Sequence, residues 1–227
     1  MANRKVIFGV NHEMGDYRTG RRKNLDLVVA RPGTETPPAQ RTFADLAARF
    51  GIVLTPDQSK RLRDLPELRS GPVGSVLVAL EAKACMTEHG KARPRLYDEL
   101  NSSHLTVHGS APGAIAAAFV MINISRTFIS PDRNKFSLAV TPPHVTRHVQ
   151  PKAAESVLEK VREMPRRSRS AEEGFDAIGI VLVDCKNDGS PIEIASAPPA
   201  PKPTDDDYYD QMVRRIRQHY EVNFSGI

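Results

Sequence analysis

The chain has little of several features that mark common classes of protein. It has no tryptophan, only two cysteines and an aromatic content of 6%. So few rings disfavour a stacking platform for single-stranded nucleic acid, because successive bases need rings to stack on. Cys85 and Cys185 do not have the spacing of metal ligands, so zinc is not expected, and they suit free thiols in a reducing compartment.

Long hydrophobic runs and nucleotide-binding motifs are also missing. No stretch approaches the roughly 18 apolar residues that span a bilayer, and the short apolar run near the start lacks the body of a signal peptide. The sequence contains no P-loop, no Gly-x-Ser-x-Gly elbow and no fixed-period repeat. We therefore expect a cytoplasmic protein without a membrane segment, and neither nucleotide hydrolysis nor serine hydrolase chemistry.

What the chain does contain is enough apolar sequence for a sizeable core, and an excess of positive charge. Its 227 residues are 40% hydrophobic, which fits one elaborated domain better than two. The formal net charge is +5. A basic surface suits a polyanionic partner, because each phosphate that it neutralises releases counterions. With so few aromatic rings, double-stranded DNA is the expected partner.

The most informative motif is Glu81-Ala82-Lys83, which ends the apolar run 75–80. Alternate side chains of a strand point to opposite faces, so Glu81 and Lys83 point the same way, about 7 Å apart. The carboxylate can hold a divalent cation, and the lysine can orient or deprotonate a water and offset negative charge on a phosphate. The tripeptide is common, however, and equally fits a weak surface ion pair at a strand end.

Asp26 supplies a second acid in a similar setting. Residues 24–30 predict another apolar strand, which follows the basic residues 21–23. An unpaired acid inside a buried strand is costly, so Asp26 needs a partner, a metal or solvent at the strand end.

This arrangement resembles the PD-(D/E)xK nuclease superfamily, whose core carries an acid on one strand and Glu or Asp, any residue and Lys on the next, followed by a helix. The resemblance covers about the first half of the chain. It implies that Asp26 and Glu81 bind Mg²⁺ or Mn²⁺, with the carbonyl of Ala82 as a further ligand, and that Lys83 assists the attacking water. It also implies a restriction-endonuclease-like core and hydrolysis of phosphodiester bonds in double-stranded DNA, as by a type II restriction enzyme.

The chain departs from the family pattern in two ways. The long interval between Asp26 and Glu81 requires a helical insertion, at about residues 31–74. Leu25 stands where the family has its proline.

A literal Pro-Asp pair occurs closer to Glu81, at residues 56 and 57. There, however, Thr55 and Pro56 have the character of an N-cap and a first helical residue, and Asp57 suits the positive end of the helix dipole. Asp26 is therefore the preferred first acid, and Asp57 and Asp64 are the alternatives.

Other polar residues are candidates for supporting roles. Glu13 precedes Asp26 and is a possible additional carboxylate, and Glu99 is a possible acid behind the site, on a helix that Pro94 is expected to open. Candidates for phosphate contacts are His89, Lys91, Arg93 and Arg95. The basic run 165–170 is another candidate. For all of these, the alternative is a solvated loop or helix face.

The predicted fold is α/β (α+β), with a central mixed sheet flanked by helices over residues 1–197. Beyond the two strands with acids, strands are expected within 114–124, 136–140 and 177–183. Residues 198–203 form a proline-rich linker, and residues 204–227 form a C-terminal helix capped by Thr204. That helix is expected to pack either on its own core or on a second copy of the chain, as in a homodimer.

The leading interpretation is a Mg²⁺-dependent endonuclease. Two alternatives belong to other classes: a nucleic-acid-binding protein that keeps the nuclease fold without activity, and an interaction protein whose C-terminal helix binds its partner. Metal-dependent cleavage separates the first from both others, and salt-dependent DNA binding separates the second from the third.

Overall fold

The computed structural model describes residues 6–34, 41–135, 142–169 and 172–224. In chain order the elements are β1 (Ile7–Gly15), β2 (Arg22–Pro32), α1 (Phe43–Arg49), α2 (Pro56–Asp64), β3 (Val73–Cys85), α3 (His89–Ser110), β4 (Ile115–Asn123), β5 (Thr127–Phe128), a 3₁₀ turn (Pro131–Arg133), β6 (Thr146–Arg147), α4 (Lys152–Arg162), β7 (Ala177–Asp184), β8 (Glu193–Ile194) and α5 (Tyr209–Phe224). The predicted strand over 136–140 lies outside the described residues.

Within these ranges, six strands form one mixed sheet in the order β1-β2-β3-β4-β7-β8. The pairs β1–β2, β2–β3 and β7–β8 are antiparallel, and the pairs β3–β4 and β4–β7 are parallel. Parallel neighbours need a crossover connection, and α3 is the crossover between β3 and β4. The predicted α/β class with a central mixed sheet flanked by helices is confirmed.

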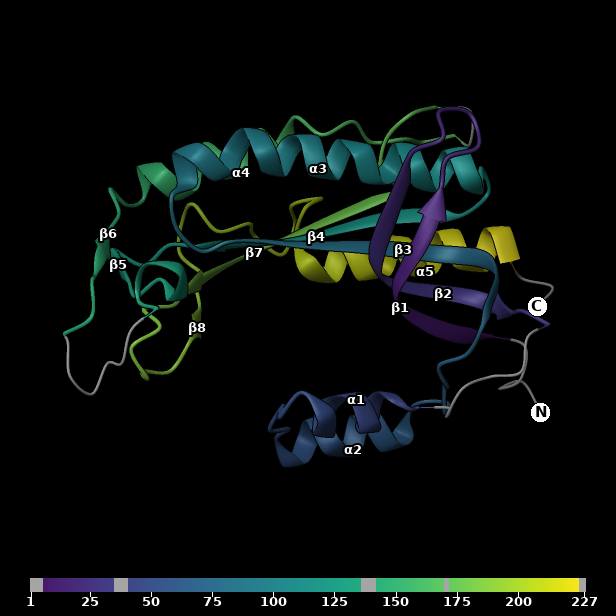
Figure 1. Ribbon diagram of the computed structural model, residues 1–227, viewed down its shortest axis with the longest axis horizontal. Coiled ribbons are helices and arrows are strands. Elements are labelled where there is room, and N and C mark those ends of the chain that lie inside the picture. Colours follow the sequence, from purple (N-terminus) through teal and green to yellow (C-terminus); the bar gives the residue numbers. More distant parts are fainter. Residues whose placement is uncertain (1–5, 35–40, 136–141, 170–171, 225–227) are drawn as a thin grey trace.

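Helices cover both faces of the sheet (Figure 1). The main core lies between the sheet and the helices α3 and α4, where Leu100 and Val157 pack among buried strand residues such as Ile122. On the other face, α5 packs Met212 and Ile216 against the sheet. No helix among the described residues has the length and apolar character needed to cross a membrane.

Helix α3 begins at His89, so the predicted start at Pro94 is wrong. The carbonyl of Glu88 accepts the N–H groups of Lys91 and Ala92 at 2.8 and 3.0 Å, which establishes the first turn before the proline. Pro94 then falls early in the helix, where the missing N–H costs one intrahelical hydrogen bond.

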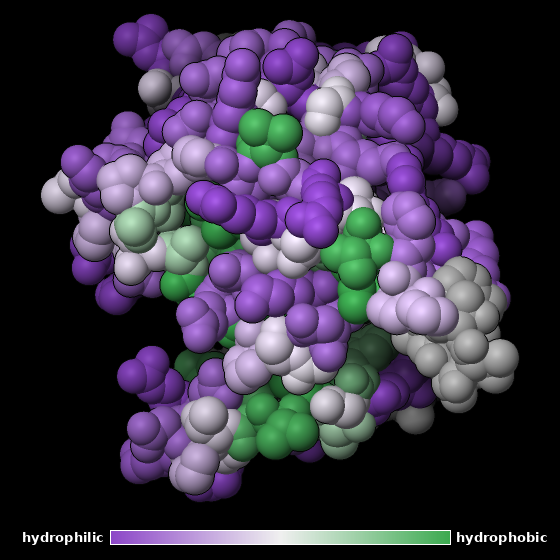
Figure 2. Space-filling model, turned by 90° about the vertical axis from the view of Figure 1, so that its left-hand side faces the viewer, coloured by the Kyte–Doolittle hydropathy of each residue, from purple (hydrophilic) through white to green (hydrophobic). Residues whose placement is uncertain are grey.

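Helices α1 and α2 occupy the predicted insertion, and α2 begins with the capping that the sequence predicts. Thr42 and Thr55 each accept the backbone N–H three residues later, and Pro56 is the first residue of α2. Neither helix contains a buried residue. The pair lies below the sheet in Figure 1, where Phe43 of α1 stacks on Phe8 of β1 with ring centroids 4.4 Å apart, and Figure 2 shows apolar surface on this lower lobe.

The C-terminal helix packs on the protein's own sheet. It begins at Tyr209 rather than directly after Thr204, because turns occupy the intervening residues. Gly179 on β7 permits a close approach, since a Cβ atom there would lie 2.7 Å from the sulfur of Met212. Of the two packing modes expected for this helix, the structure has the intramolecular one, and a homodimer stays a prediction.

Candidate active site

Glu81 and Lys83 lie side by side on β3, as strand alternation predicts. Lys83 Nζ is 2.7 Å from Glu81 Oε1. The Glu81 side chain is only 1% exposed, whereas that of Lys83 is 27% exposed. The solvated surface pair that the tripeptide alone would also fit is therefore not what forms, because one partner is inside the protein.

Lys23 is a member of the site that the sequence analysis missed. This residue on β2 places its Nζ 3.5 Å from Glu81 Oε1, and it also donates a hydrogen bond to the carbonyl of Glu99. The sequence contains a pattern from which the position of Lys23 could have been predicted. Lys23 and the buried Leu25 are two residues apart on one strand, so alternation assigns both to the face toward the core.

Glu99 connects this site to α3. Its carboxylate lies 3.3 Å from Lys83 Nζ and 2.6 Å from the Nε of Arg95. We call the five residues Lys23, Glu81, Lys83, Arg95 and Glu99 the Glu81 cluster. Acids and bases alternate through it, so each buried or half-buried charge has an opposite charge as a neighbour.

The cluster shifts the pKa values of its own members. For Lys83, burial by itself acts to lower the pKa, but the hydrogen bonds and charges of Glu81 and Glu99 outweigh it, and the pKa rises. The hydrogen bond from Arg95 lowers the pKa of Glu99. Burial lowers the pKa of Lys23, and the charge of Lys83 adds to that effect. Lys83 is therefore an ammonium at neutral pH, which suits orienting groups rather than accepting a proton.

Asp26 lies on β2 beside the same tripeptide. Its Oδ2 accepts the backbone N–H of Ala82 at 2.6 Å. The last residue pair between β2 and β3 at this end joins Leu27 to Leu80. Beyond it, the Asp26 carboxylate, and not a backbone carbonyl of β2, accepts the N–H of Ala82. The first predicted acid is thus adjacent to the peptide that follows Glu81, and this contact meets the need of a strand acid for a partner.

A divalent cation at this site would need oxygen ligands from the side chains and the backbone. Glu81 Oε2 is buried and has no hydrogen-bond partner among the described residues, so one oxygen is left for a ligand. Across the described ranges, no group of three or more His, Cys, Asp or Glu side chains could hold a metal ion. Mg²⁺ often takes only one or two carboxylates and keeps several waters, so the unpartnered Glu81 Oε2 is compatible with it, whereas Asp26 Oδ2 already accepts the N–H of Ala82.

The remaining predicted acids lie elsewhere. Glu13 is on β1, where its exposed carboxylate is 3.2 Å from Arg22 Nη1. Asp57 and Asp64 are on α2, which is apart from the sheet, and Asp64 forms an exposed ion pair with Lys60 at 2.6 Å. The structure therefore brings Asp26 to the tripeptide, and not the alternatives.

The four candidates for phosphate contacts differ in exposure, because one is buried and three are exposed. His89 is 4% exposed, and its Nε2 is 2.8 Å from the carbonyl of Asn123, so its predicted phosphate contact is corrected to a structural role. Burial at the start of α3 withdraws the ring from the surface. Lys91, Arg93 and Arg95 remain exposed on α3, and Arg95 reaches the Glu81 cluster.

Comparison of the chain with protein-family models, with curated proteins and with solved structures gives no match.

Proposed function

We propose that the protein is a metal-dependent endonuclease that hydrolyses phosphodiester bonds in double-stranded DNA, with its active site at the Glu81 cluster and Asp26. One observation carries the proposal. Within the part of the chain that the structure describes, the nearly fully buried Glu81 carboxylate has one oxygen without a partner and the other beside two ammonium groups. Such burial of charge is costly and is characteristic of functional sites.

The order of the elements supports the same reading. Asp26 lies on β2, Glu81-Ala82-Lys83 lies on the next strand of the sheet, β3, and the helix α3 follows. This is the succession that the nuclease resemblance implies. The helix also contributes Glu99, which contacts Lys83.

Each residue has a distinct role in the proposed reaction. Glu81, Asp26 and the carbonyl of Ala82 would hold Mg²⁺ or Mn²⁺, which when bound supplies positive charge to the phosphate and lowers the pKa of water. Lys83 keeps its proton on Nζ, because its pKa is raised, and would donate hydrogen bonds to the phosphate or to the attacking water.

Glu99 and Lys23 position the residues that would act. Glu99 holds Lys83 through its carboxylate and Lys23 through its carbonyl, so both ammonium groups are fixed beside Glu81. Fixed charges of this kind stabilise negative charge that develops on a phosphate, because they need not reorganise during the reaction.

A DNA-binding protein without activity is the second candidate. It is favoured by the small number of acids, since two carboxylates are the only side-chain ligands assigned to the metal. The Glu81 cluster would then serve folding, and its three positive side chains would neutralise its two carboxylates without any metal cation.

Cleavage of DNA tests the proposal. Supercoiled and linear duplexes would be incubated with Mg²⁺, Mn²⁺ or EDTA, with wild type and the nearly isosteric variants Asp26→Asn, Glu81→Gln and Lys83→Met. We expect metal-dependent nicking by wild type and a loss of more than about 100-fold in each variant, since even residues behind metal ligands contribute 10–100-fold.

The control is Glu67→Gln, which removes an acid from an exposed ion pair with Arg69 outside the cluster. Circular dichroism and thermal unfolding would establish that every variant is folded. Wild-type rates in folded Glu81→Gln would reject the proposed site. Binding of DNA without any metal-dependent cleavage would favour the second candidate.

A further inference from the structure

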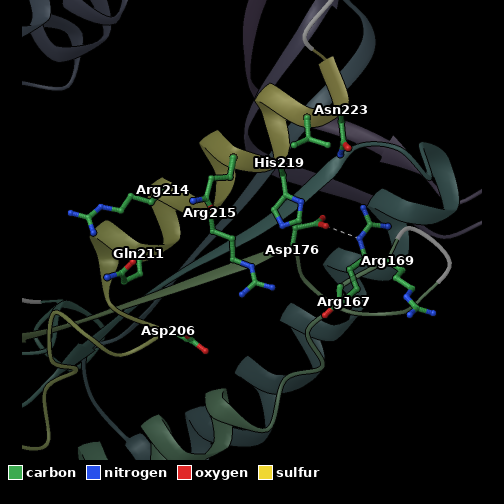
Figure 3. Close-up of a pocket in the computed structure, with 12 residues that line it drawn as sticks. Arg167, Arg169, Asp176, Asp206, Gln211, Arg214, Arg215, His219 and Asn223 are labelled. Atoms are coloured by element: carbon green, nitrogen blue, oxygen red, sulfur yellow. Dashed lines mark hydrogen bonds and ion pairs between the residues drawn. The ribbon is translucent and has the colours of Figure 1, made fainter.

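A groove lined by arginines runs along α5, the helix that covers the sheet face opposite α3. It has a volume of about 720 Å³ and lies between α5 and the segment 167–169, which connects α4 to β7. Figure 3 shows its charged residues. We call it the arginine groove, and its charged lining consists of Arg167, Arg169, Arg214, Arg215, His219, Asp176 and Asp206.

The floor of the groove is a buried ion pair. Arg167 Nε is 2.8 Å from Asp176 Oδ1, and both side chains are at most 6% exposed. Arg167 also donates to the carbonyl of Ala114, and Asp176 accepts the N–H of Ala116. The charges of the floor are thus used within the fold, and they hold the connection 167–169 in place.

The walls of the groove are different, because their arginines have no acid partner. Among the described residues, none of Arg169, Arg214 and Arg215 forms an ion pair, and the acids that line the groove are Asp176 on its floor and Asp206 on its wall. The charge of Arg215 also acts on the neighbouring Arg166. Burial is the main cause that lowers the pKa of Arg166; the charges of Asp207 and Asp206 oppose this effect, and the charges of Arg215 and Arg162 add to it.

The directions of the side chains indicate what could bind. Arg215 extends from α5 into the groove, whereas Arg214 and Arg169 extend outward on its two sides (Figure 3). Cations spread in this way do not converge on one small anion. They match a ligand whose negative charges repeat along a chain, and the planar guanidinium fork fits phosphate oxygens in particular.

We propose that the arginine groove binds the phosphodiester backbone of double-stranded DNA, outside the candidate active site. Naming DNA as the source of the phosphates rests on the proposed function, whereas the affinity for phosphate groups rests on the groove itself. A free nucleotide or pyrophosphate presents the same chemistry, so the test includes both sources. Of the basic run 165–170, which was predicted to contact a phosphate backbone, Arg169 becomes part of this proposal; Arg167 is buried in the floor, and residue 170 lies outside the described residues.

The test measures binding without cleavage. A fluorescent duplex would be titrated with the full chain in EDTA over a range of salt concentrations. The variants are Arg215→Gln and the double variant Arg169→Gln/Arg214→Gln. The matched control is Arg217→Gln, which removes one charge from the same helix at a residue that is 77% exposed and paired with Glu221.

We expect Arg215→Gln to weaken DNA binding several-fold and to reduce the slope of log K against log salt by about 1, as for one lost phosphate contact. The double variant should reduce the slope by about 2. Arg217→Gln should bind as wild type does. Equal effects of Arg215→Gln and Arg217→Gln would overturn the proposal, because the charge alone would then matter and not the groove.

Calorimetry with pyrophosphate and with a mononucleotide distinguishes the sources. If Arg215→Gln abolishes their binding but leaves DNA binding unchanged, the ligand is a small phosphate compound and the DNA assignment is overturned. The outcome is also separable from the nuclease proposal. DNA binding through the groove without cleavage would reject only the nuclease, and cleavage with unaltered DNA binding by Arg215→Gln would reject only the groove.

Discussion

The Glu81 cluster and the arginine groove both concentrate charge, but they balance it differently. Glu81 is buried beside Lys23 and Lys83, so positive and negative groups alternate in the interior. In the groove only the buried floor is balanced, and the exposed walls are positive. A charge removed from water is costly unless it is paired, whereas exposed charges are screened. We infer that the cluster is built for chemistry at one point and the groove for attraction of a polyanion.

The largest expected effect comes from breaking the buried ion pair between Arg167 and Asp176 on the floor of the groove. Asp176→Asn leaves the buried guanidinium of Arg167 without its carboxylate. Removing one partner of a buried ion pair lowers the free energy of unfolding by about 3–5 kcal/mol. Urea denaturation at neutral pH would measure this loss.

The control for that variant is Asp206→Asn on the exposed wall, which should not change the unfolding midpoint measurably. If the two variants lost the same stability, the distinction between a buried balanced floor and exposed walls would be wrong.

The next effect concerns pH and a buried histidine near the groove floor. His104 is 1% exposed, and burial, with smaller contributions from His108 and Arg167, lowers its pKa from 6.5 to about 4. Between those values the unfolded chain binds more protons, so stability falls as the pH decreases from about 6.5 to about 4. The full loss from this group is about 3 kcal/mol.

Denaturation of wild type and His104→Leu at pH 7 and pH 4.5 would check this dependence. We expect a smaller loss of stability in the variant on acidification, since the titrating group is gone. An identical loss in both proteins would contradict the assignment to His104.

A smaller effect is expected from a variant of the Glu81 cluster that tests how Glu99 positions Lys83. Glu99→Gln removes the carboxylate that holds Lys83 at 3.3 Å, but it leaves Glu81 and Asp26 in place. We expect the cleavage rate at saturating metal to fall about 10–100-fold, as for other residues behind a site, with DNA affinity nearly unchanged. Single-turnover cleavage and anisotropy would separate the two quantities. An unchanged rate would mean that the position of Lys83 is set without Glu99.

The smallest expected effect is that of an exposed pair. Arg217 and Glu221 are 2.7 Å apart on α5, but their side chains are 77% and 58% exposed. Water screens such a pair, so Arg217→Gln should leave the thermal unfolding midpoint unchanged within error. A clear destabilisation would show that exposed charges on α5 matter for folding, and it would disqualify this variant as a control for the groove.

Local rules predicted much of the candidate site. Alternation along one strand was enough to pair Glu81 with Lys83, and the apolar runs predicted the strands that carry both acids. The caps of α1 and α2 also follow from short-range chemistry. These features depend on residues a few positions apart, which a sequence displays directly.

Other features depend on contacts between distant segments. Lys23 reaches the site only because β2 and β3 are neighbours and α3 presents a carbonyl to it. His89 looked like part of a basic surface but points into the core, toward the carbonyl of Asn123 on β4. The arginine groove joins a connection after α4 to a helix about 45 residues later, so no local pattern contains it.

The most direct test of the account combines both regions in one experiment. Binding and single-turnover cleavage of the same duplex would be measured for wild type, Glu81→Gln and Arg215→Gln, with Mg²⁺ and at saturating protein. The account predicts that Glu81→Gln binds DNA like wild type but cleaves it more than about 100-fold more slowly, and that Arg215→Gln binds more weakly but reaches the wild-type rate. Cleavage by folded Glu81→Gln at the wild-type rate would contradict the central claim that the buried carboxylate is the centre of the reaction.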